Sequence, residues 1–424
     1  MNRRNYPDLR ETVYHEALSN GLNVYVSEKP EFRRQFAYFA VRYGGMDRTI
    51  VDTSGRSVTV PAGMAHFLEH KAFDSRDGRA LRNMAMRGVD PNAYTTPFLT
   101  AYYFESVRDF EENLRDLLEF VLEPYFTKSN VEKEQGIIAQ EIRMEKDDPD
   151  AEVYYRLLDA LYVSHPIRSR ILGSEDSIAE ITPEILTQCY QAAYQPSNMV
   201  LCVAGNVNPQ RVASIAREAL PERSGSLWRL EQIQTESGGV KRRYTEQTMP
   251  VSIPLFEIGF QGVPAPDGGQ LRQRLLPELV CGALFSPSAP LYSRLYEKGL
   301  INGAFDSGYD AAPGCAWLTA GGESRDPKRV MEEVLNEAAR LSREGIDPDL
   351  WERLKKAAYG GIVRQLNSLE GICAELAQGH FDGEEFFHFP ERFQSIRRTD
   401  GEELIRQWCV EERAALSVIW PEED

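Results

Sequence analysis

Strand-like and helix-like segments alternate along this chain, and the alternation occurs twice, which constrains the fold more than any other feature of the sequence. The strand-like runs lie at residues 21–26, 35–44, 92–106, 198–205, 253–259 and 317–322, and the helical periods lie at residues 107–121, 129–147, 269–285 and 327–344. A chain of 424 residues is also longer than the roughly 250–300 residues at which one hydrophobic core stops growing. The sequence therefore predicts an α+β protein built from two halves.

A polar, glycine-rich stretch separates these halves. Residues 221–226 and 236–239 combine Ser and Gly with charged residues, a composition that is typical of linkers between domains. We therefore predict an N-terminal domain over residues 1–222, a linker over residues 223–245 and a C-terminal domain over residues 246–424.

The composition excludes several classes of protein. With 42% hydrophobic and 27% charged residues, the chain is an ordinary globular sequence. Its net charge of −17 disfavours nucleic acid as a partner. No apolar run reaches the roughly 18 residues that a membrane span needs, and residues 1–7 lead into no apolar core of a signal peptide. We expect neither a nucleic-acid partner nor a membrane.

The cysteines indicate a reducing compartment. They are widely scattered and contain no CxxC pair: Cys189, Cys202, Cys281, Cys315, Cys373 and Cys409. We interpret them as buried, reduced thiols and predict a cytoplasmic protein.

The segment from His66 to His70, which reads His-Phe-Leu-Glu-His, carries the strongest chemical signal. A helix is expected to start after Pro61, and residues four apart on a helix share one face, so both imidazoles can reach a single zinc ion. Glu69 lies beside them, where it can take a proton from a metal-activated water. The simpler alternative is a pair of surface histidines beside a glutamate on an amphipathic helix.

A zinc site that keeps one position open for water needs a third protein ligand. Glu134 and Glu141, in the helical period at 129–147, are seven residues apart and therefore share a face across two turns. One of them can bind the metal while the other supports the site from outside, and Glu145 is a further candidate. From spacing alone, an ordinary solvated acidic face remains the alternative.

Together these residues resemble the inverzincins, whose HxxEH motif reverses the HExxH of other zinc peptidases, and in particular the processing-peptidase type of the M16 family. The resemblance covers nearly all of residues 10–220 and, more weakly, the second half. It rests on the block from Gly63 to His70, on Asn92-Ala93-Tyr94-Thr95 followed by Tyr102-Tyr103-Phe104, on Glu134 with Glu141, on His165-Pro166, and on residues 173–178 and 194–200.

This resemblance implies roles for the site residues. His66, His70 and Glu141 are implied as zinc ligands, Glu69 as the catalytic base and Glu134 as a residue that assists catalysis. Each half is implied to be an α/β roll, with a mainly antiparallel sheet covered by helices, and the two rolls to form half of a clam shell.

The resemblance also implies the substrate and how it binds. Unfolded peptides, such as precursor or leader peptides, would add as a strand beside residues 92–95, with backbone hydrogen bonds to Asn92, Ala93, Tyr94 and Thr95. The implied activity is that of a zinc-dependent metalloendopeptidase.

The second half departs from the family pattern. Active members carry an arginine and a tyrosine that hold the substrate and the developing oxyanion. Tyr296 stands where the arginine is expected and Asn302 where the tyrosine is expected, while Arg294 and Tyr309 are out of register.

The departure suggests that a partner completes the site. The chain resembles the zinc-bearing member of bacterial M16 pairs, which implies a heterodimer with a second M16-like subunit that lacks HxxEH. A homodimer is the alternative. A non-catalytic structural or regulatory subunit is the competing function, but decayed members of the family usually lose the zinc motif, which is intact here.

Overall fold

The computed structural model describes residues 1–220, 227–266 and 268–422, which form two compact units. The first unit contains residues 1–142, 170–232 and 363–387, and the second contains residues 143–169, 233–362 and 388–424. The units are thus interleaved along the chain. The change of unit after residue 232 falls inside the expected linker 223–245, of which residues 223–226 lie outside the described residues. The domain boundaries proposed from the sequence stay a prediction.

The first unit is built on a seven-stranded sheet. Its strands are β1 (Asn2–Tyr6), β2 (Glu11–Ala17), β3 (Asn23–Glu28), β4 (Gln35–Val41), β7 (Asn92–Thr95), β8 (Thr100–Ser106) and β9 (Met199–Gly205). A small second sheet contains β5 (Thr49–Asp52), β6 (Ser57–Thr59) and β10 (Trp228–Leu230). The order in the large sheet is β1-β2-β3-β9-β4-β8-β7. Neighbouring strands are antiparallel except for β3 and β9, which run parallel. Strand β7 is therefore an edge of the sheet.

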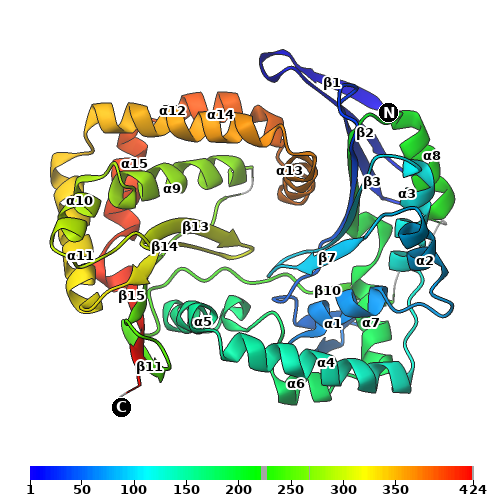
Figure 1. Cartoon of the computed structure of the whole chain (residues 1–424), viewed down its shortest axis with the longest axis horizontal. Coiled ribbons are helices and arrows are strands. Elements are labelled where there is room, and N and C mark those ends of the chain that lie inside the picture. The colour runs from blue at the N-terminus through cyan, green and yellow to red at the C-terminus, as the bar shows by residue number, and fades with distance from the viewer. Residues whose placement is uncertain (221–226, 267, 423–424) are drawn as a thin grey trace. The chain divides into compact units, whose positions relative to one another are not determined.

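Helices cover both faces of this sheet (Figure 1). The helices of this unit are α1 (Met64–Ala72), α2 (Arg79–Met86), α3 (Phe110–Leu122), α4 (Lys128–Lys146), α6 (Glu175–Ala179), α7 (Pro183–Ala193), α8 (Pro209–Ala219) and α13 (Leu369–Asp382). Of these, α1, α3, α8 and α13 pack directly on the sheet. Alternate strand residues such as Phe39 and Leu201 join Phe67 of α1 and Leu117 of α3 in one apolar core. The late helix α13 packs against β4 and β9. Its contact brings residues that are far away in the sequence into the first unit.

The second unit has a five-stranded sheet with its own helices. Its strands are β11 (Tyr244–Met249), β12 (Leu255–Gln261), β13 (Asp306–Ala312), β14 (Cys315–Glu323) and β15 (Ala414–Pro421). Its helices are α5 (Pro149–Leu161), α9 (Gln270–Phe285), α10 (Pro290–Glu297), α11 (Pro327–Glu344), α12 (Pro348–Gln365), α14 (Phe389–Ser395) and α15 (Arg398–Trp408). The strand order is β11-β15-β12-β14-β13, in which β11 and β15 are parallel and the other pairs antiparallel. Helix α5 packs against β12 and β15.

The predicted α+β class, with mainly antiparallel sheets covered by helices, is confirmed in both units. One strand prediction needs correction, because the strand-like run at 92–106 is a hairpin of β7 and β8 rather than one strand. Pro97 lies in its turn, where the lack of an N–H group costs no ladder hydrogen bond.

All six cysteines are buried free thiols. Within the described residues, no helix is long and apolar enough to cross a membrane.

The start of α1 is fixed by a close backbone contact. Gly63 precedes the helix with a φ of 88°, in the left-handed region that favours glycine. A Cβ atom on Gly63 would lie 2.5 Å from the carbonyl oxygen of Leu172. Residue 63 is therefore required to be glycine by its conformation and by its neighbour, and it determines where the His66–His70 segment begins.

We predict that Gly63→Ala lowers the free energy of unfolding by more than the roughly 1–3 kcal/mol of backbone strain alone. Gly78→Ala is the matched control, because Gly78 precedes α2 with a φ of 60° and has open space where a Cβ would lie. Chemical denaturation of both variants measures the difference. If both variants lost the same free energy of unfolding, the contact between residue 63 and Leu172 would contribute nothing to stability.

Candidate metal centre and active site

Helices α1 and α4 bring three potential metal ligands together. His66 and His70 lie one turn apart on α1, and their ring centroids are 4.5 Å from each other. One carboxylate oxygen of Glu141, on α4, lies 3.7 Å from Nε2 of His66 and 3.6 Å from Nε2 of His70. The ligand atoms of the three residues all lie within 4.8 Å of one another. The structure therefore gathers the three residues that the sequence analysis proposed as zinc ligands.

The donor set and its spacing suit zinc. Two imidazoles and one carboxylate are a ligand combination of catalytic zinc sites that keep a fourth position for water. With bonds of about 2.0–2.1 Å and tetrahedral angles, ligand atoms are separated by roughly 3.4 Å. The distances from Glu141 to the two histidines are close to this value. Glu145, one turn further along α4, is not part of the cluster found among the described residues.

Glu134 contacts the far side of His70. Its Oε1 lies 3.0 Å from Nδ1 of His70, so a proton on Nδ1 can be donated to the carboxylate while Nε2 faces Glu141. Metal-binding histidines commonly hold their second nitrogen in this way. The pKa of Glu134 is lowered, chiefly by this hydrogen bond. Glu134 is thus placed to orient His70 rather than to join the three ligands.

The two histidines differ in their electrostatic surroundings. Burial, together with the neighbouring His70, lowers the pKa of His66 to about 4, so its ring is neutral near pH 7. Its Nδ1 is buried and has no hydrogen-bond partner among the described residues. Burial also acts to lower the pKa of His70, but the hydrogen bond to Glu134 and the charge of Glu141 outweigh it and raise that pKa. A metal ion therefore displaces no proton from His66 at neutral pH, whereas binding at His70 competes with protonation.

Glu69 is a buried carboxylate beside this cluster. It is 9% exposed, and the hydroxyl of Thr95 donates a hydrogen bond to its Oε2. Burial raises the pKa of Glu69, although the hydrogen bond from Thr95 and the charge of His70 act in the opposite direction. A carboxylate whose pKa is raised accepts a proton more readily near neutral pH, as a general base must.

The edge strand β7 lies against α1 and places its side chains alternately on two faces. Ala93 packs on the apolar core and Thr95 bonds to Glu69, both on the side of the metal cluster. On the opposite face, the hydroxyl of Tyr94 lies 2.5 Å from that of Tyr38. Asn92 is exposed, and its side-chain oxygen accepts from its neighbour's amide. The four residues proposed to bind substrate therefore form an edge next to the metal cluster.

Comparison with known proteins gives the family. The model for insulinase, peptidase family M16, matches residues 59–175, and the model for the M16 inactive domain matches residues 180–358. The chain is 35% identical over 422 residues to a Bacillus subtilis protein named uncharacterized zinc protease YmfH, with 98% of each chain covered. The chain belongs to peptidase family M16. The resemblance to this family, inferred from the motifs, is confirmed.

Other M16 proteins share parts of the sequence and the whole fold. The B. subtilis protein named uncharacterized zinc protease YmxG is 25% identical over 319 residues, covering 72% of this chain and 75% of that protein. The crystal structure of an M16-like peptidase from Alicyclobacillus acidocaldarius superposes with a TM-score of 0.92 at 30% identity, over 97% and 99% of the two chains. Pitrilysin superposes with a TM-score of 0.78 at 16% identity, over 99% of this chain but 46% of its own.

The positions at which the resemblance implied an arginine and a tyrosine lie in the second unit. Tyr296, on α10, is 56% exposed and stacks on Tyr292 at 6.1 Å between ring centroids. Asn302 follows α10, and its side-chain amide donates to Glu323 at 2.6 Å. The out-of-register Arg294 pairs with the buried Glu337 at 2.5 Å. Arg294 is therefore held in a local ion pair within the second unit.

Sequence reasoning did not single out Lys71, which directly follows His70. Its side chain has 0% exposure and its ammonium contacts Asp74 and the backbone of α4. Its position directly after the motif was the only available signal, because lysine is ordinarily a surface residue.

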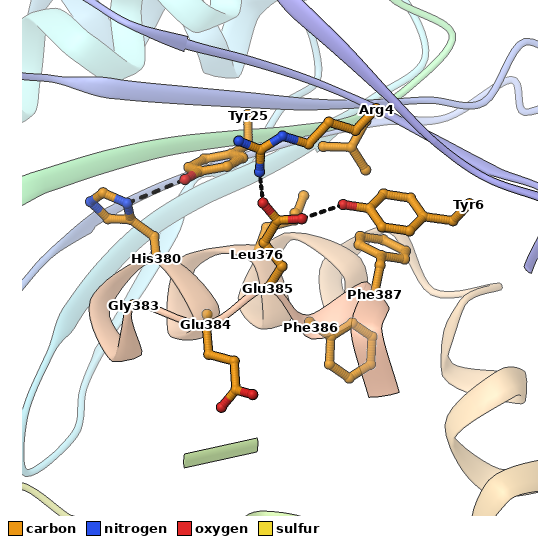
Figure 2. A pocket seen from close by; sticks show the side chains of 12 residues that line it. Arg4, Tyr6, Tyr25, Leu376, His380, Gly383, Glu384, Glu385, Phe386 and Phe387 are labelled. Carbon is orange, nitrogen blue, oxygen red and sulfur yellow. Dashed lines mark hydrogen bonds and ion pairs between the residues drawn. The ribbon is translucent and has the colours of Figure 1, made fainter. Parts of the chain in front are cut away.

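A separate cavity of about 220 Å³ lies elsewhere in the first unit (Figure 2). Glu385, which follows α13, pairs with Arg4 and accepts a hydrogen bond from Tyr6, both on β1. Across the cavity, Nδ1 of His380 lies 3.4 Å from the hydroxyl of Tyr25. The cavity shares no residue with the His66, His70 and Glu141 cluster, and its polar contacts attach the end of α13 to the sheet.

We predict that His66→Asn, His70→Asn and Glu141→Gln each weaken zinc binding by more than the roughly 10–100-fold that is typical for loss of an outer partner. Each change removes one of three ligands, so the remaining pair cannot complete the site. Glu145→Gln is the control on the same helix and is expected to bind zinc normally. Titration against a chromogenic chelator gives the affinities; normal binding by Glu141→Gln would refute the third ligand.

Proposed function

We propose that this M16 protein is a zinc-dependent metalloendopeptidase. The observation that carries the proposal is the position of Glu69, a buried carboxylate beside a two-histidine, one-carboxylate cluster and hydrogen-bonded to an edge strand. His66, His70 and Glu141 are assigned as metal ligands. The names of the relatives YmfH and YmxG, each called an uncharacterized zinc protease, support zinc as the metal.

The assigned chemistry divides between the metal and the chain. A zinc ion held by His66, His70 and Glu141 would supply Lewis-acid activation of a water molecule. The role of Glu69 would be to take up a proton on its carboxylate and return it to the leaving amine. Thr95 holds one oxygen of Glu69, which leaves the other oxygen to carry the proton. Glu134 acts through His70, as a positioning residue.

The proposed substrate is an extended, unfolded peptide, such as a precursor or leader peptide. Strand β7 is an edge of its sheet, so its free backbone groups can pair with an added strand. Because Thr95 on this strand contacts Glu69, a peptide paired along residues 92–95 would run past the general base. Folded proteins are excluded by this binding mode, since their backbone groups are already paired.

We further propose a partner subunit, in the cytoplasm, that supplies the missing arginine and tyrosine. Tyr296 stands where the resemblance implies an arginine and offers no guanidinium, and Asn302 stands where it implies a tyrosine and offers no phenol. This chain covers less than half of pitrilysin, which leaves room there for a second half of similar size. A second M16-like chain without HxxEH would fill that place. The buried free cysteines support a reducing compartment.

A non-catalytic role is the second candidate function. It is favoured by one observation, the match of residues 180–358 to the family's inactive domain. The cluster of His66, His70 and Glu141 argues against it, because a purely structural subunit has no need of a buried carboxylate such as Glu69 beside three potential metal ligands.

Glu69→Gln tests the mechanism. The substitution keeps the size and the contact with Thr95 but removes the base, so we expect full zinc occupancy and a loss of peptide hydrolysis on the order of 10²–10⁴-fold. Elemental analysis and cleavage of a quenched fluorescent peptide library measure the two quantities. Unchanged hydrolysis would show that Glu69 is not the base.

The partner is tested by reconstitution. We expect the zinc-loaded chain alone to cleave peptides poorly and to gain at least about tenfold when mixed with an M16-like chain that has the arginine and tyrosine and lacks HxxEH. A partner whose arginine and tyrosine are replaced by Met and Phe is the control. Full activity of the isolated chain would contradict the heterodimer, and light scattering would then show whether it is a homodimer.

A further inference from the structure

The burial of Lys71 is unusual for its residue type. Lysine is almost never fully buried unless its charge is paired, yet the side chain of Lys71 has 0% exposure. Transferring an ammonium group out of water is costly, so the surrounding groups must compensate for it. A methionine of similar length would fill the same space without this cost. The charge itself is therefore the property that needs an explanation.

Lys71 connects α1 with α4 at the metal cluster. Its ammonium forms an ion pair with Asp74, which follows α1, and lies 3.4 Å from the carbonyl oxygen of Asn130, in the first turn of α4. It also lies 3.8 Å from Oε2 of Glu134, one turn further along α4. These three contacts leave the ammonium surrounded by oxygen atoms.

The two oxygens of Glu134 have different partners. Oε1 lies against Nδ1 of His70 and Oε2 faces the ammonium of Lys71. A carboxylate that is held at both oxygens cannot rotate away from the imidazole. With Nδ1 of His70 occupied in this way, its Nε2 is the nitrogen that faces Glu141.

We propose that Lys71 is a positioning residue of the metal centre, which holds Glu134 in the orientation that directs Nε2 of His70 towards the metal. The role assigned to Lys71 rests on the proposed metal-binding role of His70, and it extends the site by one residue beyond the HxxEH motif. Without the ammonium, Asp74 and Glu134 are two carboxylates with no cation between them. Asp74 is 43% exposed on its side chain and can turn to water, whereas Glu134 is 12% exposed.

Lys71→Met in the full chain tests the proposal. The substitution keeps the apolar stem and removes the charge, so we expect zinc affinity to fall roughly 10–100-fold, as for other outer partners of metal ligands. Lys133→Met is the control, because Lys133 is exposed on α4 and its loss changes the net charge equally. Zinc affinity is measured by competition with a chelator, and thermal unfolding of the metal-free proteins reports on the fold.

A double-mutant cycle separates positioning from a purely structural role. If Lys71 acts through Glu134, Lys71→Met has no further effect on zinc affinity once Glu134→Gln is present. A loss that is the same in both backgrounds, or wild-type affinity in Lys71→Met, would overturn the proposal. If Lys71→Met does not fold, Lys71→Gln replaces it, with the same outcomes. Absence of zinc binding by the wild-type chain would refute the metal site itself, which is a different result.

Discussion

The proposed chemistry depends on the crossing of α1 and α4 at His70. One nitrogen of this imidazole faces Glu141 at 3.6 Å and the other faces Glu134 at 3.0 Å, so the two glutamates of α4 hold one ring from opposite sides. Gly63 fixes where α1 starts, and the apolar core under Phe67 fixes which face of the helix points inward. A shift of either helix by one residue would separate the ligands.

The seven-stranded sheet positions Glu69 beside the proposed metal ligands. Its edge strand β7 packs against α1, and Thr95 on this strand is hydrogen-bonded to Glu69. Glu69, the proposed general base, is therefore connected both to α1 and to the strand proposed to pair with substrate. In the proposed mechanism, a peptide aligned on β7 would lie close to the carboxylate of Glu69, because Thr95 contacts it.

Much of this could be predicted from local patterns. The i, i+4 spacing placed His66 and His70 on one helical face, and the seven-residue spacing placed Glu134 and Glu141 on one face of another. Spacing could not decide which glutamate contacts which nitrogen, because that depends on how α1 and α4 cross. The burial of Lys71 and the packing of α13 on the first sheet also lay outside prediction, since both depend on contacts between segments distant in sequence. The turn between β7 and β8 was not predicted, because aromatic and β-branched residues typical of strands continue on both sides of Pro97.

The most direct test of the metal assignment is a crystal structure of the zinc-loaded protein with anomalous scattering measured on both sides of the zinc absorption edge. The account predicts one ion per chain, bound by Nε2 of His66, Nε2 of His70 and a carboxylate oxygen of Glu141 at about 2.0–2.2 Å, with Glu134 still on Nδ1 of His70. An ion bound by Glu134 in place of Glu141, or one located away from α1, would contradict it.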